Sequence, residues 1–566
     1  MNSVTIRSTP APQVFRTDAI VRFITLGAIA AVIAASFLAA LHGDEIVNWG
    51  GWTLTQRFLH AALSPALDSA ILSLTASSAL TTIAFALCGS AVSVAIGAVG
   101  GVLASETWWE LVAARSPFPR SWFVWLMRCI RFALAVPRGI HELVWGLFFI
   151  NVLGLDPLVA VLAIGIPFGA ITAKVFSETL DEMPRRNARC FRASGASAAA
   201  SFAYGILPRA LPLLTSYAFY RLECAIRSAA VLGLVGAGGL GYQVLLSLQS
   251  LQYEQVWTFL YALMLLVAVT DWGSSRVMNA LRAPSATTTQ ELDRRTRWTA
   301  VGIVASLAAL VVAALYLNLD LAKPLEPVRL SMLKDVLATS LPPRFSDGDV
   351  SKLFMLSIET LVMSITAIVM AGTGALLVSC VSSMALFDVT RGEAGRARSL
   401  RGFALRTFTA AVRALLIGVR ALSDGIWVLL ALFVLFPGTF AGAFALAAYN
   451  FGIIGRLLSQ VNEDADKRPF CALRAQDASF GRALLYGFLP LILPKYLAYI
   501  LYRWEVCLRA TVVVGIVGAG GLGLRLEDQL AAFDYRGATA TLTFFVILTF
   551  IADAVSSWGR RALREA

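Results

Sequence analysis

Long apolar runs alternate with shorter charged segments along the whole chain. Uncharged stretches include 23–41, 69–105, 298–319, 361–387 and 425–455. Each is close to or above the ~20 residues that an α-helix needs to cross the hydrocarbon core of a bilayer. The longest stretches must hold two spans, and the Pro437-Gly438 pair marks a turn inside the last one. The pattern therefore predicts an all-α, polytopic bundle of transmembrane helices.

A second pattern is an internal repeat with an offset of 282 residues. Residues 204–208 (YGILP) return at 486–490 (YGFLP), and the offset holds without a gap between 131–281 and 413–563. This length of agreement indicates a duplication and not a chance periodicity. Each half is predicted to contain six helices, which gives about twelve in all. They cover 23–41, 70–104, 130–155, 157–176, 207–235 and 255–272, then 298–319, 360–387, 412–436, 439–458, 489–517 and 537–554.

An even number of spans returns the chain to its starting side, so the halves are predicted to be parallel repeats. The first half covers 1–282, a linker rich in Thr, Ser and Ala covers 283–297, and the second half covers 298–566. Arg and Lys cluster between spans on one side, which the positive-inside rule makes cytoplasmic, together with both termini. The loop 320–352 falls outside although it carries Lys and Arg, so it weakens the rule locally.

The composition agrees with a membrane protein and argues against a soluble protein, a nucleic-acid-binding protein and a metal centre. Hydrophobic residues make up 58% of the chain, charged residues only 14%, and the mean hydropathy is +0.73, which is too apolar for a soluble protein. The net charge of +12 follows mostly from the cytoplasmic loops, so no nucleic-acid partner is expected. The seven cysteines form no CxxC pair and there are only three histidines, so no metal centre is expected.

A short polar segment precedes the fifth predicted helix of each half. It reads RASGAS at 192–197 and RAQDAS at 474–479, and a Leu-Pro pair follows each time. Small residues allow close approach to another protein, and the proline ends one helix where the next span begins. The segments resemble the coupling loop with which permeases of ABC importers dock their ATPase; the alternative is a connector that only packs. The candidate coupling residues are Arg192, Ala193, Gly195, Pro208, Arg474, Ala475, Asp477 and Pro490.

The resemblance to one family extends beyond these segments. Residues 204–241 and 486–523 both run from the YG-LP motif to GAGGLG, and together with 134–165 and 340–348 they resemble phosphonate permeases of the PhnE family. The resemblance implies the ABC importer permease fold, two cytoplasmic ABC ATPases similar to PhnC, and a periplasmic or lipid-anchored binding protein similar to PhnD. Members are usually single units that dimerise, so the chain resembles such a dimer in one polypeptide.

Two features depart from the family pattern. The acidic residue that begins the coupling motif is missing, with Arg189 and Cys471 near its place, and Asp477 stands where the first half has Gly195. The second coupling segment is therefore expected to dock its ATPase differently or weakly. The chain has no GxxxxGK[ST] sequence either, so ATP and Mg are expected on the partner ATPase, and neither a cofactor nor a catalytic residue is expected here.

Both copies of GAGGLG formally match the dinucleotide fingerprint GxGxxG. The match lacks the strand–helix context of that motif, because each copy closes an apolar helix. Glycines there permit a tight bend or a close helix approach, and exposed amides at the bend could also meet an anion. A bend that serves as a gate is the favoured interpretation. The candidate residues are Gly236, Gly238, Gly239, Gly241, Gly518, Gly520, Gly521 and Gly523.

Charged residues inside the fifth predicted helices are the main candidates for a transport path. A charge at membrane depth costs several kcal/mol unless it faces the bundle interior or a wet cavity. Glu223 and Arg227 lie one helical turn apart, so a structural ion pair is an equally serious interpretation. The path candidates are Arg221, Glu223, Arg227, Arg503, Glu505 and Arg509, with Arg138 and Arg420 from the third predicted helices.

These features predict the permease subunit of an ATP-driven ABC importer for phosphonate-like anions, in the bacterial inner membrane. The choice among phosphonate, phosphate and phosphite stays open. An ABC permease for another small solute such as methionine, or an ion-coupled secondary transporter, is the alternative. The secondary transporter would be expected to have discontinuous helices and dedicated cation ligands. A membrane enzyme is a weaker alternative, because no cluster of His, Cys or carboxylates suggests catalysis.

Overall fold

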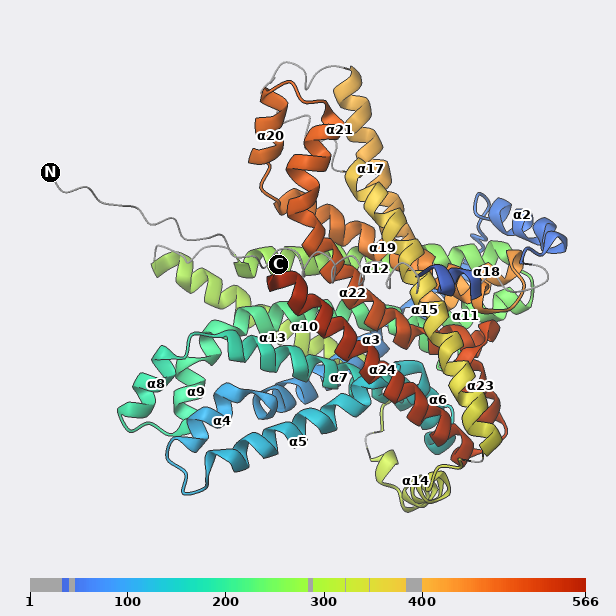
Figure 1. Ribbon diagram of the computed structural model, residues 1–566. Helices are drawn as coiled ribbons and strands as arrows, with labels where there is room; N and C mark the ends of the chain where they lie inside the picture. Colours follow the sequence, from blue (N-terminus) through green and yellow to red (C-terminus); the bar gives the residue numbers. More distant parts are fainter. Residues whose placement is uncertain are drawn as a thin grey trace.

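The computed structural model of the protein is helical almost throughout (Figure 1). It describes residues 33–39, 46–282, 289–320, 322–345, 347–382 and 400–565. Of the first predicted span, 23–41, only 33–39 is described, and this piece is helical. Residues 289–297, which composition assigned to the linker, already belong to α13 (Thr289–Tyr316), so the second half begins its first helix earlier than the sequence predicts.

The two halves contain matching series of helices. The first half contains α2 (Trp52–Ala61), α3 (Ser69–Ala104), α4 (Glu106–Ala113), α5 (Arg120–Gly139), α6 (Glu142–Leu153), α7 (Pro157–Glu182), α8 (Arg186–Ala193), α9 (Ala198–Gly205), α10 (Leu207–Gly233), α11 (Gly239–Gln249) and α12 (Tyr253–Arg282). The second contains α13, α14 (Pro327–Ser340), α15 (Asp347–Ser382), α17 (Leu400–Ala421), α18 (Asp424–Val434), α19 (Thr439–Asp464), α20 (Arg468–Ala475), α21 (Phe480–Ala483), α22 (Leu489–Val514), α23 (Gly521–Ala531) and α24 (Tyr535–Glu565). The pairs α7/α19, α8/α20 and α11/α23 keep the 282-residue offset at both ends.

Fewer helices than the predicted twelve meet the length and hydropathy of a membrane span. Within the described residues there are seven such helices, or nine if each of two sharply bent pairs counts as one span. The remaining three predicted spans have separate explanations. The first lies mostly outside the described residues, α13 has a short apolar part at Val304–Tyr316, and α10 forms but carries Arg221, Glu223 and Arg227 within its apolar length.

The third predicted helix of each half is broken, which corrects the expectation of one continuous span. α5 and α6 meet at 85°, and α17 and α18 meet at 96°. The backbone is extended at the break, and His141 caps α6 by accepting a hydrogen bond from the amide of Leu143 at 3.2 Å. Ser423 has the same extended conformation before α18. Each break therefore places the positive N-terminal end of a short helix inside the bundle.

Small residues bring the long helices into close contact. A Cβ on Gly97 of α3 would lie 2.3 Å from Cγ2 of Thr172 in α7, and one on Gly101 would lie 2.6 Å from Cβ of Phe176. The hydroxyls of Ser93 and Thr172 hydrogen-bond at 3.1 Å across the same interface. Without a hydrophobic driving force in lipid, such close packing and interhelical hydrogen bonds hold α3 against α7.

The chain ahead of α2 reaches across to the second half. Val47 forms an antiparallel bridge with Leu435 after α18, and the Asn48 amide donates to Val434 O at 2.9 Å. In Figure 1, α2, α11, α18 and α23 gather on the right, whereas the hairpin of α8 and α9 lies at the lower left and that of α20 and α21 at the top. The two halves are thus interlocked around a shared centre.

Candidate functional site

A cavity of about 380 Å³ lies where the two halves meet. Its walls come from α7 and α10 of the first half, from α19 and α22 of the second, and from both helix breaks. We call it the central cavity. Seven of the eight predicted path residues line it: Arg138, Arg221, Glu223, Arg227, Arg420, Arg503 and Arg509. Glu505 instead lines an adjoining cavity of about 940 Å³, which shares Arg138 and Arg509 with the first.

The lining is more positive than negative. Among the described residues it contains the arginines Arg138, Arg221, Arg227, Arg420, Arg456, Arg503 and Arg509 and the acids Glu142, Glu223, Asp271 and Asp424. Two further carboxylates, Glu505 and Asp553, contact its arginines from outside the lining and offset part of the excess. A low-dielectric site with this balance favours an anion.

Both fifth helices carry the ion pair that their sequence spacing allows. Nη2 of Arg227 lies 3.3 Å from Oε1 of Glu223, and Nη2 of Arg509 lies 3.4 Å from Oε1 of Glu505. Both arginines also line the central cavity, so a role in the path and a structural role both stay open predictions. Arg509 further donates to the backbone oxygen of Arg138 at 3.0 Å, which links α22 to α5 across the halves.

A second set of ion pairs crosses between the halves in both directions. Asp271 of α12 lies 3.1 Å from Arg420 and 2.5 Å from Arg456, both of the second half. Asp553 of α24 lies 3.1 Å from Arg138 of the first half. Lys174, the repeat equivalent of Arg456, completes this reciprocal arrangement at 4.0 Å from Asp553. The matched Asp positions were visible in the sequence, but their partners lie on helices of the other repeat.

The equivalent arginines Arg221 and Arg503 have different neighbours. The guanidinium carbon of Arg221 lies 3.8 Å from the ring centre of Phe168, whereas Arg503 donates Nε and Nη2 to Oδ1 of Asn450 at 3.1 and 2.6 Å. Phe168 and Asn450 are themselves repeat equivalents in α7 and α19. The two sides of the cavity therefore differ in chemistry although the backbone repeats.

The helix breaks add polar residues that sequence reasoning missed. His141, Glu142, Ser423 and Asp424 line the central cavity. Oγ of Ser228 donates to Glu142 at 2.6 Å, which ties α10 to the start of α6. The available signal was a pair of polar residues at equivalent positions inside apolar runs. Within the described part of the chain, no group of three His, Cys, Asp or Glu side chains is placed to hold a metal ion.

The predicted glycine bends lie at sharp turns away from the central cavity. Gly236, Gly238 and Gly239 between α10 and α11 have φ values of 92°, 97° and 77°, which side chains disfavour, and Gly518, Gly520 and Gly521 repeat them at 109°, 91° and 71°. Gly241 and Gly523 serve close approach, since a Cβ would lie 1.8 Å from Ala230 O and 2.6 Å from Val512 O. The Leu240 amide donates to Thr82 Oγ1 at 2.9 Å and the Leu522 amide to Thr360 Oγ1 at 3.0 Å, so neither is free for an anion. Their role as a gate stays a prediction.

Each predicted coupling segment folds as a helical hairpin at the end of the bundle. Ala193 and Ala475 end α8 and α20, while Pro208 and Pro490 lie in the first turn of α10 and α22. Gly195 has φ 101° and Asp477 has φ 57°, so both positions use the left-handed region. Nη1 of Arg192 donates to Ala196 O at 2.8 Å and that of Arg474 to Ala478 O at 2.5 Å. The glycine-to-aspartate difference therefore leaves the local turn similar, whereas the second helix of the hairpin differs: α9 covers Ala198–Gly205, but α21 ends at Ala483 and a π-helical turn follows at Leu484–Phe488. Different docking of the second hairpin stays a prediction.

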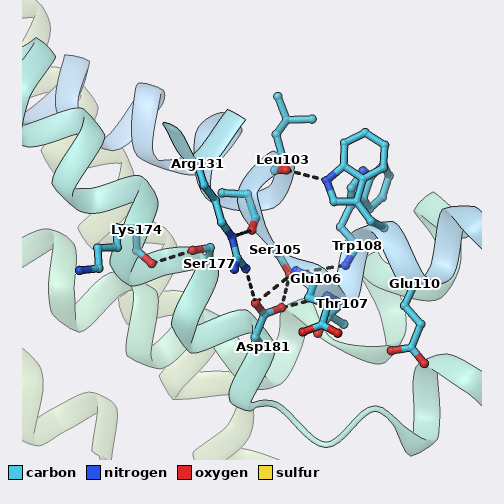
Figure 2. Close-up of polar contacts among 12 residues, drawn as sticks. Leu103, Ser105, Glu106, Thr107, Trp108, Glu110, Arg131, Lys174, Ser177 and Asp181 are labelled. Atoms are coloured by element: carbon cyan, nitrogen blue, oxygen red, sulfur yellow. Dashed lines mark hydrogen bonds and ion pairs between the residues drawn. The ribbon is translucent and has the colours of Figure 1, made fainter. Parts of the chain in front are cut away.

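A carboxylate of α7 holds α4 beside the first hairpin (Figure 2). Asp181 accepts from the Ser105 hydroxyl at 2.7 Å, from the amides of Glu106 and Thr107 at 3.1 and 2.9 Å, and from Arg131 at 3.2 Å. It thereby satisfies the free amides at the start of α4.

From α4, Glu110 reaches the first hairpin. Its carboxylate lies 2.7 Å from Arg185 and 2.8 Å from Arg189. Arg189, which departs from the family pattern, thus has an acidic partner on a neighbouring helix.

Comparisons with known proteins agree with these features. The family model described as "Binding-protein-dependent transport system inner membrane component" matches residues 111–321. The phosphate-import permease protein PhnE of Mycolicibacterium smegmatis is 24% identical over 426 residues, which are 75% of this chain and 76% of that protein. These nearly equal shares mean that the two chains are about equally long.

Shorter relatives match part of the chain. The phosphite transport system permease protein PtxC of Stutzerimonas stutzeri is 29% identical over 192 residues, 34% of this chain and 66% of that protein. The putative cryptic phosphonate transport system permease protein PhnE2 of Escherichia coli is 33% identical over 112 residues, 20% of this chain and 92% of that protein. No solved structure matches significantly. With its apolar helices and this family match, the chain is a multi-pass membrane protein and belongs to the permeases of ABC importers, of the PhnE type.

Proposed function

We propose that the chain is the membrane-spanning subunit of an ATP-driven importer that moves phosphonate-like oxyanions through the central cavity. The observation that carries this proposal is the cluster of buried arginines between the halves. Guanidinium groups match the oxygens of phosphate and phosphonate groups by paired hydrogen bonds. The printed names of the relatives, which refer to phosphate, phosphite and phosphonate, support the same substrate class.

Energy and selection would come from partners, as for ABC importer permeases in general. The partners proposed here are two PhnC-like ATPases, which would bind ATP and Mg, and a PhnD-like binding protein that delivers substrate. The hairpins α8–α9 and α20–α21 would receive the closing motion of the ATPases. Because ion pairs join the halves around the cavity, a rigid movement of one half against the other would break and remake them.

The proposed arrangement in the membrane follows the charge pattern. Residues 1–282 and 298–566 would form parallel repeats in the bacterial inner membrane, joined by the linker 283–297, with both termini and both hairpins in the cytoplasm. The end of α14 and the loop around Pro343 would face outside. The binding protein would then approach from the α14 side and the ATPases from the side of the hairpins.

Uptake into sealed vesicles tests the proposal. The chain is reconstituted with its ATPase and binding protein, and uptake of phosphate, phosphite and methylphosphonate is followed with and without ATP. We expect uptake of at least one of them that requires ATP and both partners. Uptake that needs only the chain and an ion gradient would overturn the proposal, and so would transport of methionine in place of the oxyanions.

The ion-gradient arm of this experiment has a structural reason. The breaks between α5 and α6 and between α17 and α18 are the discontinuities expected of a secondary transporter. Their ends in the central cavity carry Glu142 and Asp424, which could bind a cation. The arginine excess and the two hairpins favour ATP-driven anion import, and the gradient arm decides between the two mechanisms.

A further inference from the structure

The strongest asymmetry in the central cavity concerns two pairs of equivalent residues. On the second-half side, Asn450 is fully buried and its Oδ1 accepts two hydrogen bonds from Arg503, while its Nδ2 donates to Leu446 O at 2.8 Å. On the first-half side, Phe168 occupies the equivalent position and offers Arg221 only the face of its ring. Nε and Nη2 of Arg503 are thus used within the protein.

Because the ring of Phe168 covers only the face of the Arg221 guanidinium, the N–H edge of that guanidinium stays available to a ligand. Its Nε and Nη2 are buried and have no hydrogen-bond partner among the described residues. The same holds for Nη1 of Arg227 and Nε of Arg420, which line the same cavity. These three side chains are only 6%, 8% and 9% exposed. Buried charged donors without partners are costly, so the cluster is built for a ligand that accepts several hydrogen bonds.

We propose that the central cavity holds one binding site for a tetrahedral oxyanion, formed by Arg221 and Arg227 of the first half and by Arg420 of the second half, which lies beside Glu223 of the first. The equivalent place beside Arg503 offers fewer free donors, because Asn450 occupies Nε and Nη2 of that arginine, although Nε of the neighbouring Arg509 is also buried without a partner. This site deepens the proposed function and rests on it for the identity of the anion, a phosphate or phosphonate group. The planar N–H edge of Arg221 binds two of the anion's oxygens, and Phe168 holds the guanidinium in that orientation.

The neighbouring carboxylate limits how tightly the anion is held. Oε1 of Glu223 lies 3.3 Å from Arg227 and 3.5 Å from Arg420, so it competes with the ligand for both arginines. A transport site must release its ligand, and an internal competitor supplies that property. Ile171 and Val231 add apolar lining to the cavity, which leaves room for a small alkyl group on the phosphorus.

Equilibrium dialysis of the full-length chain in nanodiscs tests the site directly, without ATP or partner proteins. Inorganic phosphate and methylphosphonate serve as probes, with sulfate as a competitor. We expect about one anion bound per chain. Arg221→Met should weaken binding roughly ten- to a hundredfold, the range for lost hydrogen bonds to a charged group, whereas Arg503→Met should weaken it by less than about threefold.

Two substitutions of Phe168 form the sharper comparison. Phe168→Asn supplies the acceptor that Arg503 has on the other side, so it should occupy the donors of Arg221 and weaken binding about tenfold or more. Phe168→Leu removes the ring that orients Arg221 but supplies no acceptor, so it should weaken binding clearly less than Phe168→Asn does. The thermal unfolding midpoint of each variant shows whether it is folded.

The outcomes separate this proposal from the proposed function. Equal losses from Arg221→Met and Arg503→Met, two anions per chain, or no binding by the unaltered chain would each overturn the single site. ATP-dependent oxyanion uptake in vesicles would then still support the importer. Conversely, asymmetric binding without ATP-dependent uptake would keep the site and overturn the importer.

Discussion

Oδ2 of Asp271 in α12 lies 2.5 Å from Nη1 of Arg456 in α19, so a carboxylate of one half closes an ion pair with a base of the other. Asp553 and Arg138 form the reciprocal contact at 3.1 Å. All four side chains are at most about a quarter exposed, at 16%, 27%, 21% and 14%. Removing one member of such a pair leaves its partner partly buried and uncompensated.

Asp271→Asn should therefore destabilise the contact between the halves. Arg456 loses its carboxylate partner and Arg420 keeps Glu223 at 3.5 Å, and because the site is partly exposed we expect a cost of about 1–3 kcal/mol. The thermal unfolding midpoint of the purified chain should fall. Asp466→Asn is the matched control, since its 3.9 Å pair with Arg468 is largely exposed, and it should change stability by ~0.5 kcal/mol or less. Equal midpoints for both variants would contradict a structural role of Asp271.

Substitutions in the first coupling hairpin can separate the effect of backbone conformation from the effect of side-chain size. Gly195 has φ 101°, and a Cβ there meets nothing within 4 Å, so any new side chain would point into open space. Gly195→Val should reduce ATPase co-purification and stimulated hydrolysis several-fold, because a β-branched residue strains a left-handed position.

Gly195→Asp is the control, because it reproduces the residue that already adopts φ 57° at 477 in the second half. It should keep most of the coupling. If both substitutions abolish docking equally, the partner needs an empty space there and the conformation is secondary. That result would support the prediction that the second hairpin, which carries Asp477, docks its ATPase differently.

Arg227→Ala should lower oxyanion uptake about tenfold or more and leave assembly with the ATPase intact. Its contacts lie within α10 or face the cavity, so few interhelical contacts are lost. Arg509→Ala should also lower uptake, but in addition it removes the hydrogen bond to Arg138 O and should lower the thermal unfolding midpoint. Uptake and complex assembly are measured together. Loss of assembly in the Arg227 variant, or unchanged uptake, would remove it from the transport path.

Cysteine labelling tests the proposed topology. In a chain without its native cysteines, Leu341→Cys beyond α14 should react with a membrane-impermeant maleimide in intact cells, since residue 341 is 59% exposed. Ser194→Cys in the first hairpin is also on the surface and should react only after the membrane is opened. Labelling of both positions from outside would contradict parallel repeats with cytoplasmic hairpins. The linker position Ser285 falls outside the described residues, so these two positions take its place.

Sequence reasoning was most successful where one helix carries the whole signal. The predicted spans 157–176 and 439–458 correspond to α7 and α19, and helical spacing gave the Glu223–Arg227 pair, whereas α11 and α23 were not predicted as helices. The prediction of one continuous third helix in each half was wrong. The residues on both sides of the break are apolar, and hydropathy does not show whether two apolar helices continue in line or meet at an angle. The polar pairs His141-Glu142 and Ser423-Asp424 at the breaks were the local signs.

Contacts between repeats could not be derived from the repeat itself. The matching of Asp271 with Asp553 was visible in the sequence, but a duplicated pattern does not say whether each acid pairs within its own half or with the other. The difference between Arg221 and Arg503 is a similar case, since it depends on Phe168 and Asn450 one helix away. Tertiary packing, and not local spacing, decides both.

The difference between Phe168 and its repeat equivalent Asn450 also has a consequence for how the two sides of the cavity can evolve. When a permease assembles from two copies of one gene product, every mutation appears on both sides of the axis at once. A tandem gene lets each side change alone. One arginine can therefore become hydrogen-bonded within the protein, as Arg503 is, while its repeat equivalent Arg221 stays available to bind a solute. Fusion in this chain thus creates room for unequal halves, and selection can adjust the two halves of the pore one at a time.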